Sequence, residues 1–253
     1  MTGDERFLFD LQGWITIPDA LSADELQQLN ALMDRRVEAE MTADSYRHRF
    51  THLLDWGRAY RDLIDHAAIY PRLLELLGAG LRLDHEYAVV LRKPPAPGIN
   101  ILHGGATPFD ATQYYHYNNG EMRNGLMVVA FNLKDVNPGN GGFAVVSGSH
   151  KSNIPFPEHW RTQAASLDCV QKVAAPAGTA IIFTEALTHG TLPWTSAAER
   201  RTLFYKYSPA PLSWASRYYC VQDYPDLTPR QRELLEAPNA RYPERFITST
   251  PPE

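Results

Sequence analysis

A chain of 253 residues carries 24 Lys and Arg residues against 29 Asp and Glu residues, which gives a formal net charge of −5. Because no dense basic tract accompanies this charge, the sequence excludes the electrostatic surface that nucleic acid or an anionic membrane would need, and a small-molecule partner is expected. Two widely spaced cysteines and an acidic N-terminus, with no apolar run long enough for a signal peptide or a membrane span, favour a cytoplasmic protein without a disulfide framework, and no pattern indicates an oligomeric state.

The first 80 residues are expected to form a mainly helical scaffold. A short strand over 14–17 comes first. Ser22, followed three residues later by Glu25, then forms a capping box that predicts the start of an amphipathic helix. A second helical region is expected over 61–77, where apolar residues are dense and a glycine follows.

Short apolar and β-branched runs replace the helical pattern from about residue 81. Seven strands are expected, separated by turn-rich segments such as DVNPGNGG. They lie in RLDHEYAVVLRKPP, INILH, GLMVVAFNL, GGFAVVSGS, VQKVAA, TAIIFT and TLFYKYS. This spacing of short strands indicates a β-sandwich or barrel over 81–210. A short helix from Thr228 and a polar tail over 211–253 complete what is expected to be a single domain, 1–253.

Two of the nine histidines, His103 and His189, are each expected at the end of an apolar strand, and each is followed at once by glycine. Strand ends of a closed sheet converge on one mouth, so the pair can form a two-histidine metal site although the residues are far apart in the chain. Arg200 and Arg201 then open a strand whose alternation turns one guanidinium inward. A buried arginine needs an acidic partner, and a ligand carboxylate can supply it.

Four segments together resemble the phytanoyl-CoA dioxygenase family of non-haem iron, 2-oxoglutarate-dependent oxygenases: DLQGWITIPDALSADEL, LRKPPAPGINILHG, DVNPGNGGFAVVSGSHKSN and IIFTEALTHGTLPWTSAAERR. The resemblance implies an all-β core with peripheral helices, a double-stranded β-helix of the jelly-roll or cupin-like barrel type. It also implies Fe(II) and 2-oxoglutarate as cofactors. The activity it implies is that of a dioxygenase that oxidises, for instance hydroxylates, a C–H bond of a small metabolite or natural-product intermediate.

The resemblance also implies roles for single residues. His103 and His189 match the two histidine ligands of the metal, and Arg200 matches the arginine that binds the far carboxylate of 2-oxoglutarate. The other positions implied in the cosubstrate pocket are Thr191, Phe131, His85 and Tyr87. For His85 and Tyr87, packing in the core is the alternative.

The sequence departs from the family pattern at Gly105, where the family has the aspartate of an H-x-D pair. Three interpretations remain open. Another carboxylate, from Glu185 or Asp110, can replace the missing ligand. Alternatively, the vacant position can hold halide, as in related iron halogenases whose motif ends in alanine or glycine. The third possibility is a jelly roll that binds a small molecule without catalysis.

The aromatic segment over 112–125 is a candidate lid for the mouth of the barrel. Tyr114, Tyr115 and His116 would then face the substrate. The alternative is a surface hairpin that turns at the sequence NNG.

Overall fold

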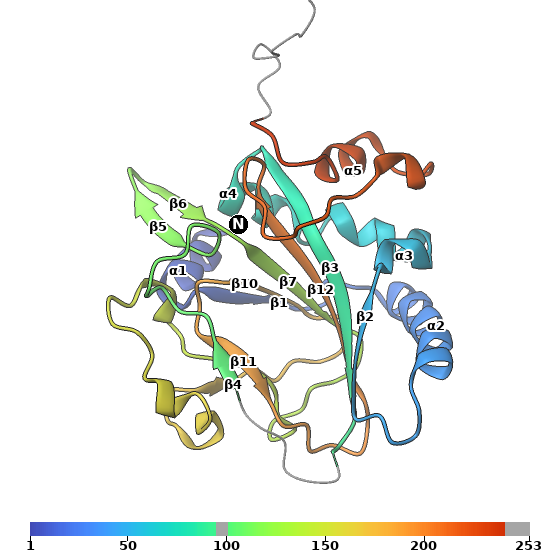
Figure 1. The fold of residues 1–253 in the computed structure, drawn as a ribbon, viewed down its shortest axis with the longest axis horizontal. Coiled ribbons are helices and arrows are strands. Elements are labelled where there is room, and N and C mark those ends of the chain that lie inside the picture. The colour runs from blue at the N-terminus through green and yellow to red at the C-terminus, as the bar shows by residue number, and fades with distance from the viewer. Residues whose placement is uncertain (95–100, 241–253) are drawn as a thin grey trace, which may run out of the picture.

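The computed structural model describes residues 1–94 and 101–240, and its centre is a pair of facing antiparallel sheets. Figure 1 shows the long strands β3 and β12 side by side through the middle of the molecule, with β4 and β11 to their left and α2 and α3 to their right. The expected jelly-roll core with peripheral helices is confirmed, as two packed sheets rather than a closed barrel.

The larger sheet has six strands in the spatial order β1-β10-β7-β12-β3-β2. Their bounds, in that order, are Trp14–Ile17, Ala180–Thr184, Met127–Asn132, Arg200–Pro209, Leu81–Leu91 and Arg47–Thr51. The smaller sheet has the order β4-β11-β8-β9, with bounds Ile101–His103, His189–Leu192, Gly142–Val145 and Gln171–Lys172. A separate hairpin is formed by β5 (Tyr115–Asn118) and β6 (Glu121–Asn124).

Over residues 1–94 and 101–240, five α-helices lie around the sheets: α1 (Gly3–Gln12), α2 (Ala23–Glu40), α3 (Arg58–Arg61), α4 (Tyr70–Leu77) and α5 (Pro229–Leu234). The expected capping box opens α2. The Ser22 hydroxyl accepts a hydrogen bond from the Glu25 amide at 3.3 Å, and the Glu25 carboxylate accepts one from the Ser22 amide at 2.8 Å. Within the described residues, none of the helices combines the length and the apolar character that crossing a bilayer requires.

Two apolar cores follow from the alternation of side chains along the larger sheet. Val90, Phe131, Leu203 and Tyr205 point to one face and pack with residues of the helices. Residues of the other face pack against the smaller sheet, and this second core comprises Trp14, Val128, Ala130, Phe143, Val145, Val173, Ile181, Phe183 and Leu187. The larger sheet is therefore covered on both faces, and polar side chains that remain on its inner face need a specific reason to be there.

All seven expected strands are present, but β11, the strand that begins at His189, was not among them. In the first 80 residues the sequence did not predict α1 or α3. It also did not predict the edge strand β2, whose sequence RHRFT buries only Phe50. A strand that buries a single apolar residue carries no apolar run, so its pairing with β3 was not visible in the sequence.

Candidate metal centre

His103 and His189 lie directly opposite each other on adjacent strands. His103 is the last residue of β4 and His189 the first of β11, and the antiparallel register pairs the two residues. Their ring centroids are 4.2 Å apart. The pairing thus brings two imidazoles, distant in the chain, to a separation at which they can coordinate one ion.

The hydrogen bond that His189 makes leaves its Nε2 atom free to coordinate a metal ion. The Nδ1–H of His189 donates to the Leu187 carbonyl at 2.7 Å, which fixes the tautomer with the lone pair on Nε2. Burial lowers the pKa of His189. Repulsion between the two rings when both are protonated and, after it, burial lower the pKa of His103 to about 4. Both rings are therefore neutral at pH 7, the form that binds a metal.

Glu185 supplies a carboxylate to the same cluster. It follows β10 directly and is 4% exposed. Its Oε2 lies 3.9 Å from Nε2 of His189, and one ligand atom from each of His103, Glu185 and His189 falls within 4.8 Å of the others. Two imidazole nitrogens and a carboxylate oxygen are the donor set of the facial triad that holds non-haem iron.

Lys206 keeps the Glu185 carboxylate ionised and in place. Its Nζ donates to Oε1 of Glu185 at 2.6 Å, so Oε2 is the oxygen left toward the histidines. Burial alone would raise the pKa of Glu185. The neighbouring His189 and Lys206 lower the pKa by more than burial raises it, so the pKa of Glu185 lies below the usual value. The carboxylate is thus charged at neutral pH.

The first glycine after His103, Gly104, allows the turn that carries Glu185 to lie close to the end of β4. Gly104 has φ +76°, and a Cβ there would lie 2.4 Å from the Leu187 carbonyl oxygen and 2.9 Å from that of Glu185. Any side chain would therefore push β4 away from the turn. Gly104 is required for the close approach of the two segments.

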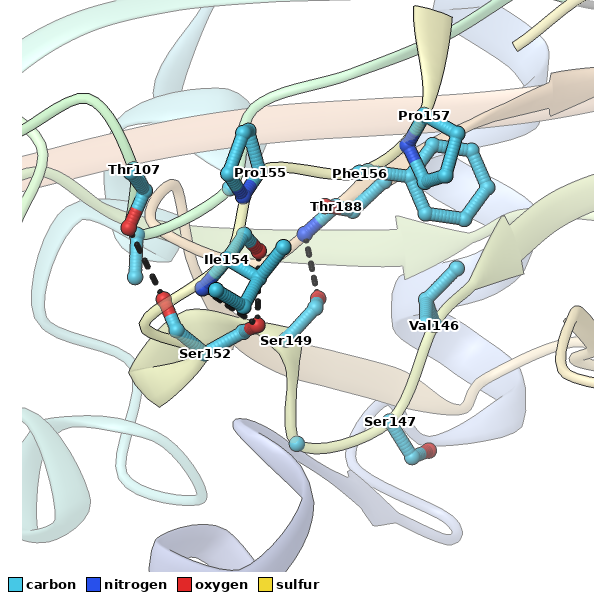
Figure 2. A pocket seen from close by; sticks show the side chains of 13 residues that line it. Thr107, Val146, Ser147, Ser149, Ser152, Ile154, Pro155, Phe156, Pro157 and Thr188 are labelled. Carbon is cyan, nitrogen blue, oxygen red and sulfur yellow. Dashed lines mark hydrogen bonds between the residues drawn. The ribbon is translucent and has the colours of Figure 1, made fainter. Parts of the chain in front are cut away.

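The second glycine, Gly105, does not face the cluster. It has φ +119°, and a Cβ added there would lie 3.0 Å from Oγ1 of Thr188, with no atom of either histidine within 4 Å. Gly105 and Thr188 line a separate cavity of about 400 Å³. Figure 2 shows Thr188 in this cavity beside Ser149, whose hydroxyl accepts a hydrogen bond from the Thr188 amide at 2.7 Å. In this backbone a side chain at position 105 would be directed away from the metal cluster.

The other proposed replacement for the missing aspartate, Asp110, lies outside the cluster. It is exposed, and its Oδ1 accepts hydrogen bonds from the amide and the hydroxyl of Thr112, both at 2.7 Å. It caps a surface turn.

Arg200 is a buried guanidinium without an acidic partner among the described residues. It is 2% exposed, and its Nε has no hydrogen-bond partner. Burial lowers its pKa to about 10. Gly142 makes room for it, because a Cβ at position 142 would lie 3.2 Å from Nε. A buried, unpaired guanidinium with free space beside it fits an anionic ligand whose carboxylate supplies the missing partner.

The next residue, Arg201, is also buried but is fully paired. Its guanidinium donates to Glu199 at 2.7 Å and to Asp34 at 2.6 Å. Alternation along β12 therefore separates the two arginines: Arg201 joins a protein ion-pair network, and Arg200 faces the space between the sheets.

His103, Glu185, His189 and Arg200 line one cavity of about 260 Å³. Thr191, two residues after His189 on the same face of β11, lines it as well. Three phenylalanines form its apolar wall: Phe143, Phe183 and Phe204.

The prediction that Phe131 forms the aromatic wall was wrong. Phe131 is fully buried on the helix-facing side of β7, where its ring lies 6.0 Å from that of Tyr205. The alternation of β7 gives the opposite face to Val128 and Ala130, which explains the error.

His85 and Tyr87, the weaker pocket candidates, separate in the structure. Tyr87 lines the cavity and stacks on Phe204 at 4.8 Å. His85 does not line it, because its Nδ1 pairs with Asp84 at 2.7 Å and its ring stacks on Trp214 at 5.0 Å.

The segment predicted as a lid is the surface hairpin of β5 and β6. Asn119 and Gly120 have φ values of 52° and 82°, as a tight hairpin turn requires. Tyr114, Tyr115 and His116 do not line the metal cavity, and Tyr115 instead donates to Asp10 of α1. The segment over 112–125 is therefore the surface hairpin that the NNG turn indicated, and it is not a lid over the metal cavity.

Three cationic residues of the cavity were missed: Lys206, Arg47 and Arg49. Period-two alternation from Arg200 places Lys206 on the same face of β12, so that signal was present in the sequence. Arg47 and Arg49 alternate in the same way, but only once β2 is known to be a strand.

Comparison with known proteins agrees with this architecture. The sequence model of the phytanoyl-CoA dioxygenase (PhyH) family matches residues 9–202. The chain belongs to the phytanoyl-CoA dioxygenase family. The expected family, and the enzyme class of Fe(II)/2-oxoglutarate-dependent dioxygenases, are thereby confirmed. No curated protein matches the chain significantly in sequence.

Solved structures share the fold of this family member at low sequence identity. HygX from Streptomyces hygroscopicus, with nickel and 2-oxoglutarate bound, superposes with a TM-score of 0.76 at 20% identity over 84% of this chain and 89% of HygX. SnoK, a non-haem α-ketoglutarate-dependent carbocyclase from nogalamycin biosynthesis, gives 0.62 at 21% identity over 83% and 85%. SnoN, an epimerase from the same biosynthesis, gives 0.60 at 19% over 82% and 83%. At these identities the likeness shows the fold.

Proposed function

We propose that this PhyH-family protein is an Fe(II)- and 2-oxoglutarate-dependent oxygenase that oxidises, by hydroxylation, a C–H bond of a small metabolite or natural-product intermediate in the cytoplasm. One observation carries the proposal: two neutral imidazoles and a buried carboxylate converge in the same cavity that holds a buried arginine without a protein partner. Solved relatives in fold carry iron, or nickel with 2-oxoglutarate.

The residues present fit the metal. His189 offers Nε2 because its Nδ1–H is committed to Leu187, and His103 stands opposite in register. Glu185 replaces the aspartate that the family has two residues after the first histidine. When bound, ferrous iron with 2-oxoglutarate supplies, from O₂, the oxidant that removes hydrogen from an unactivated C–H bond, and the protein contributes mainly the orientation of the two partners.

The opposite end of the cavity fits the cosubstrate. Arg200 holds a full positive charge at neutral pH in a cradle opened by Gly142, and a bidentate carboxylate satisfies it. Thr191 offers a hydroxyl on the same wall. These two residues orient the far carboxylate of 2-oxoglutarate, while the phenylalanines exclude water from the reacting end.

The test is an anaerobic titration of the protein with ferrous iron and 2-oxoglutarate, followed by the metal-to-ligand charge-transfer absorption, and then by succinate formation in air. The wild type should develop the band and form succinate. His189→Ala should lose both, and His159→Ala, at an exposed histidine outside the cluster, should keep both. Undiminished turnover in His189→Ala would refute the assignment.

The same titration separates the two alternatives. A band that shifts with added chloride would favour halogenation with halide bound at iron, and the absence of any band would favour a binding protein without catalysis. The position of Glu185 favours oxygenation, because a protein carboxylate already reaches the cluster and leaves no ligand position that only a halide can fill.

A further inference from the structure

Two arginines outside the proposed metal and cosubstrate residues also line the cavity. Arg47 and Arg49 lie on the edge strand β2 and point to the inner face of the larger sheet. The register pairs Arg47 with Leu91 of β3, and Leu91 pairs on its other side with Arg200. Arg47 and Arg200 therefore flank Leu91 on one face of the sheet, Arg200 at the buried position and Arg47 at the exposed edge.

Neither edge arginine has an acidic partner in the part of the chain that the structure describes. Arg201 on the same sheet, by comparison, contacts two carboxylates. Arg47 and Arg49 are exposed and unpaired at the mouth of a cavity instead.

Stacking holds Arg49 in a definite orientation. Its guanidinium carbon lies 3.8 Å from the centre of the Tyr87 ring, and Tyr87 in turn stacks on Phe204. A guanidinium stacked by its face keeps its N–H groups free at its edge, where they can donate to an acidic group. The contact orders the donors before a ligand arrives and so lowers the entropic cost of binding.

The charge of the cavity is not balanced by the proposed cofactors. Four cationic side chains (Arg47, Arg49, Arg200 and Lys206) line it, against the single carboxylate of Glu185. A ferrous ion and a 2-oxoglutarate dianion cancel each other, so an excess of three positive charges remains after loading. The whole chain, in contrast, has a net charge of −5. Such a concentration of positive charge in a hollow attracts and orients an anion.

We infer that Arg47 and Arg49 form a binding site for an acidic group of the substrate, a phosphate or a carboxylate, so that the enzyme oxidises an anionic small molecule. The inference rests on the proposed function and names its substrate class. The acidic group binds at the β2 edge of the cavity, and the rest of the molecule extends along Tyr87 toward the metal cluster.

Isothermal titration of the protein loaded with nickel and 2-oxoglutarate tests the inference, with inorganic phosphate and acetate as separate probes. The double variant Arg47→Gln/Arg49→Gln should bind the preferred anion at least tenfold more weakly than the wild type. The control Arg35→Gln/Arg123→Gln removes the same charge from exposed positions on α2 and β6 and should stay within twofold. Tighter binding of phosphate than of acetate would identify a phosphorylated substrate, and the reverse a carboxylate.

Three results would overturn the inference: equal anion binding by the double variant and the wild type, no binding of either anion by the wild type, or a loss of 2-oxoglutarate affinity in the double variant. The last would make the pair part of the cosubstrate site. If the wild type developed no charge-transfer band, the proposed function would be wrong, but the anion site would still be testable. Titration of the metal-free protein with phosphate or acetate would then compare the double variant with its control.

Discussion

Replacing Arg200 by methionine should affect stability and cosubstrate binding in opposite directions. Burial lowers the pKa of this arginine from 12.5 to about 10. Since a tenfold change in an equilibrium constant corresponds to about 1.4 kcal/mol, the buried charge costs the folded state about 3 kcal/mol at neutral pH. Methionine keeps the aliphatic packing and removes the charge. The free energy of unfolding of the metal-free protein should therefore rise, by at most this amount.

The same change should weaken 2-oxoglutarate binding severely. A carboxylate buried without its cationic partner costs about 3–5 kcal/mol, which corresponds to an affinity lower by roughly 150- to 5,000-fold. The assay is the anaerobic charge-transfer titration with ferrous iron, paired with urea unfolding of the metal-free protein at pH 7.

Arg201→Met is the matched control, since the two arginines are neighbours on β12. Arg201 is bonded to Glu199 and Asp34, so its loss removes charged hydrogen bonds and should destabilise the protein by about 1–3 kcal/mol. Its 2-oxoglutarate affinity should stay unchanged. If Arg200→Met were destabilised as much as this control, or bound 2-oxoglutarate normally, Arg200 would not be a vacant carboxylate site.

Other changes have equally definite expectations. Glu185→Gln should lower ferrous affinity at least about tenfold in a metal titration, since even the indirect partners of metal ligands contribute that much; unchanged affinity would leave Glu185 only the counter-ion of Lys206. Gly105→Asp should not tighten iron binding, and both it and the control Gly105→Ala should lose about 1–3 kcal/mol of unfolding free energy from the strain at φ +119°; an Asp variant that binds iron more tightly would show that the backbone rotates toward the cluster. Burial lowers the pKa of His150 to about 4. The unfolded state therefore takes up the proton first as the pH falls from 6.5 to 4, and this histidine should lower stability by up to about 3 kcal/mol over that window. Urea unfolding of His150→Gln should show a correspondingly smaller loss between these pH values, and identical pH profiles would contradict the burial argument.

The sequence by itself determined most of the strands, the family and the two histidines, but not the strands β2 and β11. Apolar runs broken by turn signals fix strands locally, and all seven expected strands are present. The glycines after His103 and the spacing between His189 and Arg200 are also local features, because a turn or an alternating strand constrains only neighbouring residues.

The sequence could not say which side chain replaces the missing aspartate or which arginines face the substrate. Glu185 joins the cluster because the pairing of β4 with β11 brings the turn after β10 against Gly104. From the sequence alone, a solvated turn residue was an equally good interpretation of this carboxylate. Arg47 joins the cavity because β2 pairs with β3. Both contacts depend on strand pairing between residues far apart in the chain, which is set by the packing of the whole sheet, and the tertiary structure alone decided them.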